Sequence, residues 1–80
     1  MNSRQAREVL GQAANIAGDL KRIGLTCKQE TRAGLALEGM GLRQIARLEK
    51  TSDNGVERSL KSAGNKAFNY IEGTWPLRSP

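Results

Sequence analysis

The N-terminal part of the chain carries apolar residues at steps of three and four positions. They are Val9, Ala13, Ile16, Leu20 and Ile23. This spacing places them on one face of a helix. Ser3 can cap the start of that helix, and Gly24 stands where a left-handed residue would stop it. The pattern therefore predicts a first helix from Ser3 to Ile23.

Two shorter helices are predicted in the middle of the chain. Thr26 followed by Gln29 is a capping-box pattern, which opens a second helix that runs to about Glu38. Gly39-Met40-Gly41 ends it, and a third helix covers Leu42 to about Glu49. The positions expected to face inward on these two helices are Ala33, Leu35 or Ala36, Leu37, Leu42, Ile45 and Leu48.

The C-terminal part predicts a fourth helix and a short fifth one. Residues 51–55 supply turn and cap residues for a helix from about Asp53 to Ser62. Ala63-Gly64-Asn65 can end it, and Lys66 to Glu72 can form one last helix. Its inward positions are Ala67, Phe68 and Ile71. The two prolines keep residues 74–80 irregular, because proline removes a backbone donor.

These elements predict an all-α fold of four to five short helices with a helix-turn-helix. We expect one helical domain over residues 1–80. It divides into an N-terminal helix (1–25), a helix-turn-helix core (26–63) and a C-terminal part with a short helix and an irregular tail (64–80). A chain of 80 residues with 38% hydrophobic residues and one Trp, one Tyr and one Phe has a small core. Its stability should be marginal, so a partner chain can add to it.

The charge of the chain favours a polyanionic partner. Thirteen Lys and Arg residues against eight Asp and Glu residues give a net charge of +5. Nucleic acid or an acidic protein surface would match this excess. No basic tail carries it, so the fold must create any binding face.

The residue types present argue against catalysis and metal binding. Cys27 is the single cysteine and the chain has no histidine, which excludes an internal disulfide and the usual Cys/His zinc site. Cys27 is interpreted as a small apolar residue rather than a nucleophile. Charged residues interrupt the first 30 positions, so we expect no signal peptide or membrane span and a cytoplasmic protein. Because the sequence offers no catalytic or metal-binding set of residues, we also expect that the protein is not an enzyme and needs no cofactor.

Residues from about Gly41 to Leu60 match the packing pattern of a helix-turn-helix. That motif needs a small residue where its two helices touch, and Ala46 supplies it beside the inward-pointing Ile45. Val56 and Leu60 anchor the second helix. Ser52 in the turn offers an oxygen to the free amides of that helix. Lys50 occupies the turn position where most families have glycine.

The same stretch resembles two families of DNA-binding motif. Ile45-Ala46-Arg47-Leu48, Ser52 and Val56 stand where the helix-turn-helix of the lactose-repressor family has Val-Ala-Arg-Leu, then Ser and Val. With Leu37-Glu38-Gly39 included, it is also similar to the motif of resolvase-like recombinases and insertion-sequence transposases. Trp75-Pro76-Leu77-Arg78 resembles the ending of phage Ner-type repressors. A tryptophan folded back on a thin core is the preferred interpretation of that tail, and a partner contact is the alternative.

The resemblance implies that the helix from Asp53 enters the major groove of double-stranded DNA. Arg58 is then the residue best suited to guanine, and Asn54 can pair with adenine. The full set of expected DNA-binding residues is Arg43, Gln44, Arg47, Ser52, Asn54, Arg58, Lys61 and Lys66. Asp53 and Glu57 lie on the same face. A carboxylate can accept from cytosine, but a solvated helix whose N-terminal dipole is served by Asp53 is the alternative.

The leading hypothesis is a sequence-specific regulator of transcription from a phage or mobile element, acting as a homodimer on a two-fold site. The alternative is a protein-binding module that uses the same fold to engage or inhibit a host protein. Small residues on the first helix could form the dimer interface, although packing within the chain is the preferred interpretation. They are Ala6, Gly11, Ala14, Ala17 and Gly18.

Overall fold

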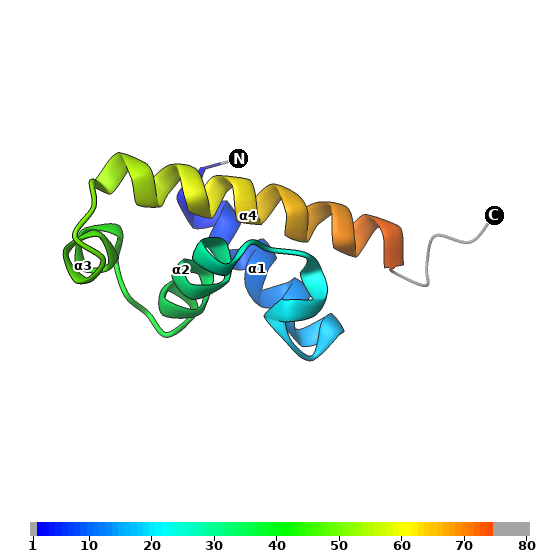
Figure 1. Cartoon of the computed structure of the whole chain (residues 1–80). Coiled ribbons are helices and arrows are strands. Elements are labelled where there is room, and N and C mark those ends of the chain that lie inside the picture. Colours follow the sequence, from blue (N-terminus) through cyan, green and yellow to red (C-terminus); the bar gives the residue numbers. More distant parts are fainter. Residues whose placement is uncertain (1, 75–80) are drawn as a thin grey trace.

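The computed structural model describes residues 2–74, and all the regular elements in this range are helical (Figure 1). The fold is all-α, as predicted. In chain order the elements are α1 (Ser3–Ala17), the 3-10 helix η1 (Leu20–Ile23), α2 (Cys27–Leu37), α3 (Leu42–Leu48) and α4 (Asp53–Thr74). The expectation for the tail around Trp75 lies outside the described residues.

The start of α1 is fixed by a reciprocal cap. The Asn2 side-chain oxygen accepts a hydrogen bond from the Gln5 backbone N–H at 2.9 Å, and the Gln5 side chain accepts from the Asn2 N–H at 3.0 Å. This arrangement satisfies two amides that the first turn leaves free. Asn2 therefore caps the helix, and the prediction that Ser3 does so is wrong.

The end of α1 comes earlier than its apolar spacing predicts. Gly18 adopts a left-handed conformation with a φ of 83°, which stops the helix after Ala17. The Asp19 side chain then accepts from the Lys21 N–H and starts η1. Ile23 still reaches the core from η1. The prediction of one continuous helix from Ser3 to Ile23 is therefore wrong in its last third.

The bounds of α2 are as predicted. Thr26 and Gln29 form the expected capping box, with side chain to backbone distances of 3.2 and 3.1 Å. The helix stops before Gly39, which has a φ of 100°. Glycine is the residue that takes this left-handed position at least cost.

The turn after α3 has the same geometry without a glycine. The Thr51 N–H donates to the Ala46 carbonyl at 2.9 Å and the Lys50 N–H to the Arg47 carbonyl at 3.3 Å, which is a Schellman motif. Lys50 takes the left-handed position with a φ of 55°, and among the described residues it alone does so without being a glycine. A side chain there costs roughly 1–2 kcal/mol. The tight turn thus forms although Lys50 does not favour it.

The last helix is continuous where two were predicted. α4 runs from Asp53 to Thr74, straight through Ala63-Gly64-Asn65, which the sequence analysis placed at a helix end. A glycine inside a helix costs about 1 kcal/mol. Gly64 is buried, and α4 packs more extensively on α1 than any other two elements pack on each other. This packing offsets the cost, so the predicted break at residues 63–65 is wrong.

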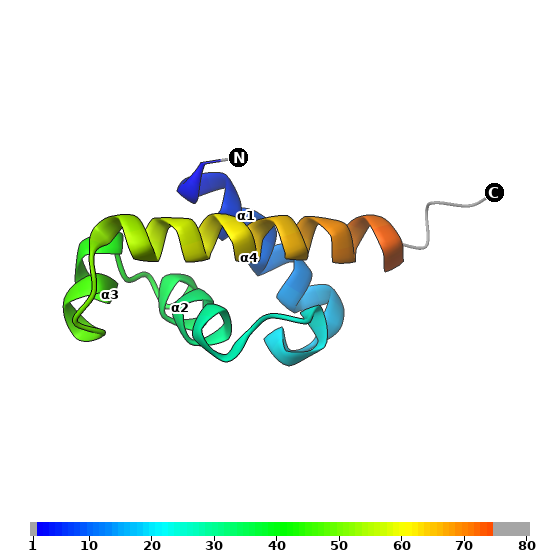
Figure 2. The ribbon, with the colours of Figure 1, turned by 45° about the horizontal axis from the view of Figure 1, so that its top comes forward.

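The core lies between α4 and the other helices and consists mainly of alanine. α1 crosses α4 diagonally, while α2 and α3 lie along one side of α4 (Figures 1 and 2). The largest fully buried side chains are only Leu10, Ile45, Val56 and Leu60. The alanines buried around them are Ala6, Ala13, Ala17, Ala33, Ala36, Ala46, Ala63 and Ala67. Such small side chains let the helices approach closely but bury little apolar area per residue.

Several large apolar residues that were expected inside lie at the surface. Leu48 is 59% exposed and Phe68 is 47% exposed, and Ile16 and Leu37 are also exposed. The residues buried in their place on the same helices include Ala13 and Ala17 of α1, Ala33 and Ala36 of α2, Ile45 and Ala46 of α3, and Ala63 and Ala67 of α4. The inward predictions for these four residues are therefore wrong. Although α4 is long, no helix in residues 2–74 is apolar enough over a sufficient length to cross a bilayer.

Candidate nucleic-acid interface

The first half of α4 is held against α3 by buried apolar residues. Ile45 and Ala46 of α3 and Val56 and Leu60 of α4 belong to one core cluster and are almost fully buried. The turn adds a cap, because the Ser52 hydroxyl oxygen accepts from the Gly55 N–H at 3.1 Å. These contacts fix which side of α4 faces away from the protein.

A polar surface lies on the outward side of this half of α4. Asn54 and Arg58 are exposed one turn apart, and Lys61 follows on the next turn. With Ser52, Gly55 and Glu57, these side chains line one shallow depression. Four of the predicted DNA-binding residues are thus brought together: Ser52, Asn54, Arg58 and Lys61.

The two acidic residues of this surface each have a basic partner. The Arg43 Nε lies 3.7 Å from an Asp53 carboxylate oxygen, and the Lys61 Nζ lies 3.9 Å from a Glu57 oxygen. The first pair is exposed and the second is half-exposed, and both are long, so they contribute little to stability. They do reduce the negative charge that the two carboxylates would present to a polyanion. Within the described residues Arg58 forms no ion pair, so its guanidinium is available to a ligand.

The predicted residues of α3 are exposed but differ in what they contact. Arg43 forms the ion pair with Asp53 described above. The Gln44 side-chain oxygen accepts a hydrogen bond from the Gly41 N–H at 3.1 Å, which stabilises the start of α3 and leaves only the rest of the side-chain amide for a ligand. Arg47 is exposed. Arg43 therefore places positive charge beside the N-terminal end of α4, and Arg47 adds an exposed positive charge on α3.

Lys66 lies apart from the other predicted residues. Its Nζ donates to the Gln29 side-chain oxygen at 2.9 Å, and the Gln29 amide nitrogen donates to the Ser62 hydroxyl at 3.1 Å. These bonds join the start of α2 to the middle of α4. Lys66 is half-buried in this connection and does not line the depression that Arg58 and Lys61 line.

A buried arginine that the sequence analysis missed connects three parts of this region. The Arg32 Nε of α2 bonds to a Glu49 carboxylate oxygen at 2.5 Å, and one terminal nitrogen donates to the Ser59 hydroxyl at 2.5 Å. The Gly55 carbonyl lies 3.4 Å from the same nitrogen. Arg32 thereby links α2 to the end of α3 and to α4. One signal was available, since Arg32 shares the inward face of its helix with Ala33 and Ala36.

The described residues contain no group of three or more Cys, Asp or Glu side chains that could hold a metal ion. The site they form is a polar, partly basic surface rather than an enclosed pocket.

Comparison of the chain with family models, with curated proteins and with solved structures finds no match.

Proposed function

We propose that the protein binds double-stranded DNA, with the first half of α4 lying in the major groove. The observation that carries this proposal is the face formed by Asn54, Arg58 and Lys61. It is polar, with Asn54 and Arg58 exposed and Lys61 half-exposed, and it lies on a helix whose opposite side is anchored by Val56 and Leu60. A helix presented in this way fits the width of the major groove.

The side chains on this face divide into two roles. Arg58 carries the planar fork that pairs with both guanine acceptors, and Asn54 can pair with adenine in the same bidentate manner. Arg43, Arg47 and Lys61 provide charge for backbone phosphates, which position the protein without selecting sequence. Ser52, Gln44 and Lys66 stay in the proposed interface with smaller roles, because each forms a hydrogen bond within the protein. Among the described residues, Arg43 and Lys61 form only long ion pairs, at 3.7 and 3.9 Å, with Asp53 and Glu57.

In this proposal the chain is a sequence-specific regulator of transcription, of the small kind that phages and mobile elements encode, and it acts in the cytoplasm. It acts as a homodimer, because one such module buries too little DNA surface for tight specific binding. Sedimentation equilibrium measures the oligomeric state, and a protein that is monomeric at high concentration would contradict the proposed homodimer.

The proposal predicts that Arg58→Ala removes most of the sequence discrimination and leaves the fold intact. Arg58 is exposed, so the variant should melt like the wild type. The lost base contact should reduce the ratio of specific to non-specific affinity by roughly 5- to 150-fold, which corresponds to about 1–3 kcal/mol. The site is first selected from a random duplex library with the wild-type protein, and both proteins are then titrated with it and with a scrambled duplex.

Arg22→Ala is the matched control, because Arg22 is an exposed arginine on η1 and its loss changes the net charge equally. The control should keep the wild-type discrimination ratio. An unchanged ratio for Arg58→Ala would show that Arg58 does not contact bases.

A protein partner is the second candidate, and one observation favours it. Leu48 is 59% exposed at the end of α3, and it does not line the depression that Asn54, Arg58 and Lys61 line. Protein interfaces bury such residues. In this case Leu48→Ser would abolish partner binding while DNA titrations show no specific complex. A specific DNA complex that Leu48→Ser leaves unchanged would exclude this candidate.

A further inference from the structure

The start of α1 and the start of α3 together line a second shallow depression. Its lining residues are Ser3, Arg4, Arg7, Glu8 and Leu42. Leu42 directly precedes Arg43, whose guanidinium lies 3.7 Å from Asp53 at the start of α4. The depression therefore reaches α3 one residue before an arginine of the proposed DNA-binding surface, although its other lining residues belong to α1.

The Arg7 side chain has a hydrogen-bond donor without an acceptor. Its Nε is buried and has no partner within the described residues, and it is the one buried side-chain nitrogen or oxygen there in this condition. An unpaired buried donor is unfavourable, because it has lost its hydrogen bonds to water without gaining others. Neither Arg4 nor Arg7 forms an ion pair with a described residue. Arg4 and Arg7 are therefore two positive charges that are available to an anion from outside the protein.

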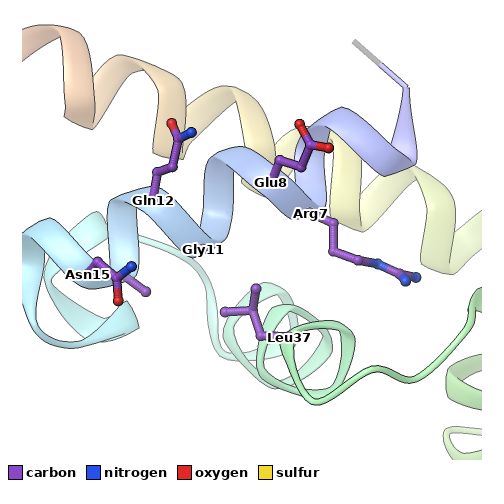
Figure 3. Close-up of a pocket in the computed structure, with 7 residues that line it drawn as sticks. Arg7, Glu8, Gly11, Gln12, Asn15 and Leu37 are labelled. Atoms are coloured by element: carbon purple, nitrogen blue, oxygen red, sulfur yellow. The ribbon is translucent and has the colours of Figure 1, made fainter.

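Figure 3 shows how Arg7 lies. Its side chain leaves α1 toward the segment that joins α2 to α3, while the Glu8 side chain points to a different side of the helix. Arg7 also lines a neighbouring depression, with Gly11 and Leu37. The nearest carboxylate along the chain is therefore not directed at the Arg7 guanidinium, and an external anion is the acceptor that the geometry leaves open.

We infer that Arg4 and Arg7 bind a backbone phosphate of the same DNA duplex that α4 contacts. The inference rests on the proposed function. Arg7 lines the depression, and an arginine guanidinium can donate from two nitrogens to two phosphate oxygens. Arg4, three residues earlier, lies on the adjacent turn of α1 and contributes the second charge. α1 thereby extends the phosphate-binding surface beyond α3 and α4.

The test is the salt dependence of binding to a fluorescent duplex of mixed sequence. The variants are Arg4→Met, Arg7→Met and the double variant, because methionine keeps an apolar stem and removes the charge. Each phosphate contact that is lost should lower the slope of log affinity against log salt by about 1. The double variant should therefore lose about 2 in slope, while its discrimination between a selected and a scrambled site stays at the wild-type value.

The matched control removes two charges at the opposite end of α1. Lys21 and Arg22 lie on η1, are exposed and line neither depression. The double change Lys21→Met with Arg22→Met should leave the slope near that of the wild type. Thermal melting of each variant checks the fold. Arg4→Met remains decisive if Arg7→Met fails to fold, because Arg4 is exposed.

The outcomes separate this inference from the proposed function. A slope for the Arg4 and Arg7 variants equal to that of the Lys21 and Arg22 control would overturn the inference and leave DNA binding standing. A loss of sequence discrimination would also overturn it, since it would mean contact with bases. If the wild-type protein shows no salt-dependent binding at all, the proposed function itself fails.

Discussion

Arg32→Ala is expected to lower the free energy of unfolding by about 3 kcal/mol or more, the largest effect of any single substitution considered. Breaking a buried ion pair by removing one partner typically costs about 3–5 kcal/mol, because the other charge stays buried without compensation. The Glu49 side chain keeps 21% of its surface exposed, so the lower end of that range applies. A domain of this length has about 4–12 kcal/mol in total.

The matched control is Arg43→Ala, which also breaks an arginine–carboxylate pair. In that pair the side chains of Arg43 and Asp53 are 85% and 54% exposed, so the loss should be close to zero. Urea unfolding of the three proteins measures the difference. Equal stabilities for Arg32→Ala and Arg43→Ala would show that the Arg32 cluster does not hold the helices together.

Replacing both partners tests the same point in the opposite direction. Arg32→Met combined with Glu49→Met leaves no buried charge, so the double variant should recover much of the stability that Arg32→Ala loses. Arg32→Met alone is the reference for this comparison, because it keeps the packing and leaves the Glu49 charge unpaired. A double variant more stable than Arg32→Met would show that the unpaired charge causes the loss.

Ala46→Leu is expected to destabilise the fold by about 1–3 kcal/mol through overpacking. Ala46 is 2% exposed and belongs to the core cluster that contains Ile45, Val56 and Leu60. Three further carbon atoms at this position would push α3 away from its neighbours. For a domain of this size each kcal/mol lowers the Tm by roughly 4–8 °C.

Arg47→Leu is the control for Ala46→Leu, because it introduces leucine at the neighbouring exposed position of the same helix. Its Tm should stay near that of the wild type. Since 1 kcal/mol corresponds to roughly 4–8 °C, overpacking at Ala46 should lower the Tm by about 4 °C or more. A Tm for Ala46→Leu within about 2 °C of the control would show that the core has room for a leucine there.

Local signals predicted those parts of the fold that local contacts decide. The Thr26 and Gln29 capping box and the stop at Gly39 depend on residues within a few positions, and the structure has both. Ser52 caps α4 for the same reason. Such contacts can be inferred from the sequence because the partners are chain neighbours.

The continuity of α4 could not be predicted in this way. Ala63-Gly64-Asn65 is a plausible helix end by composition, and only the packing of α4 on α1 makes it a helix interior. Tertiary contacts override a local preference of about 1 kcal/mol. The early end of α1 at Gly18 is the opposite case, since periodic apolar residues continued past a glycine that takes a left-handed φ.

The candidate site was predictable in part. The outward face of Asn54, Arg58 and Lys61 follows from helical periodicity once Val56 and Leu60 are assigned to the core. Lys66 was placed with them because its charge, and not its bond to Gln29, is visible in the sequence. The Arg32 cluster joins residues 17 and 27 positions apart, and no spacing rule connects them.

Binding of the wild-type protein to duplex DNA as a function of salt tests the central claim most directly. The protein is titrated into a labelled duplex of mixed genomic sequence between about 50 and 200 mM salt, a range over which six to ten phosphate contacts lose about 10³–10⁵ in affinity. We predict binding that weakens steeply and linearly on logarithmic axes, with a selected site bound more tightly than a scrambled one. Affinity that is absent at low salt, or that does not change with salt, would contradict DNA binding by this surface.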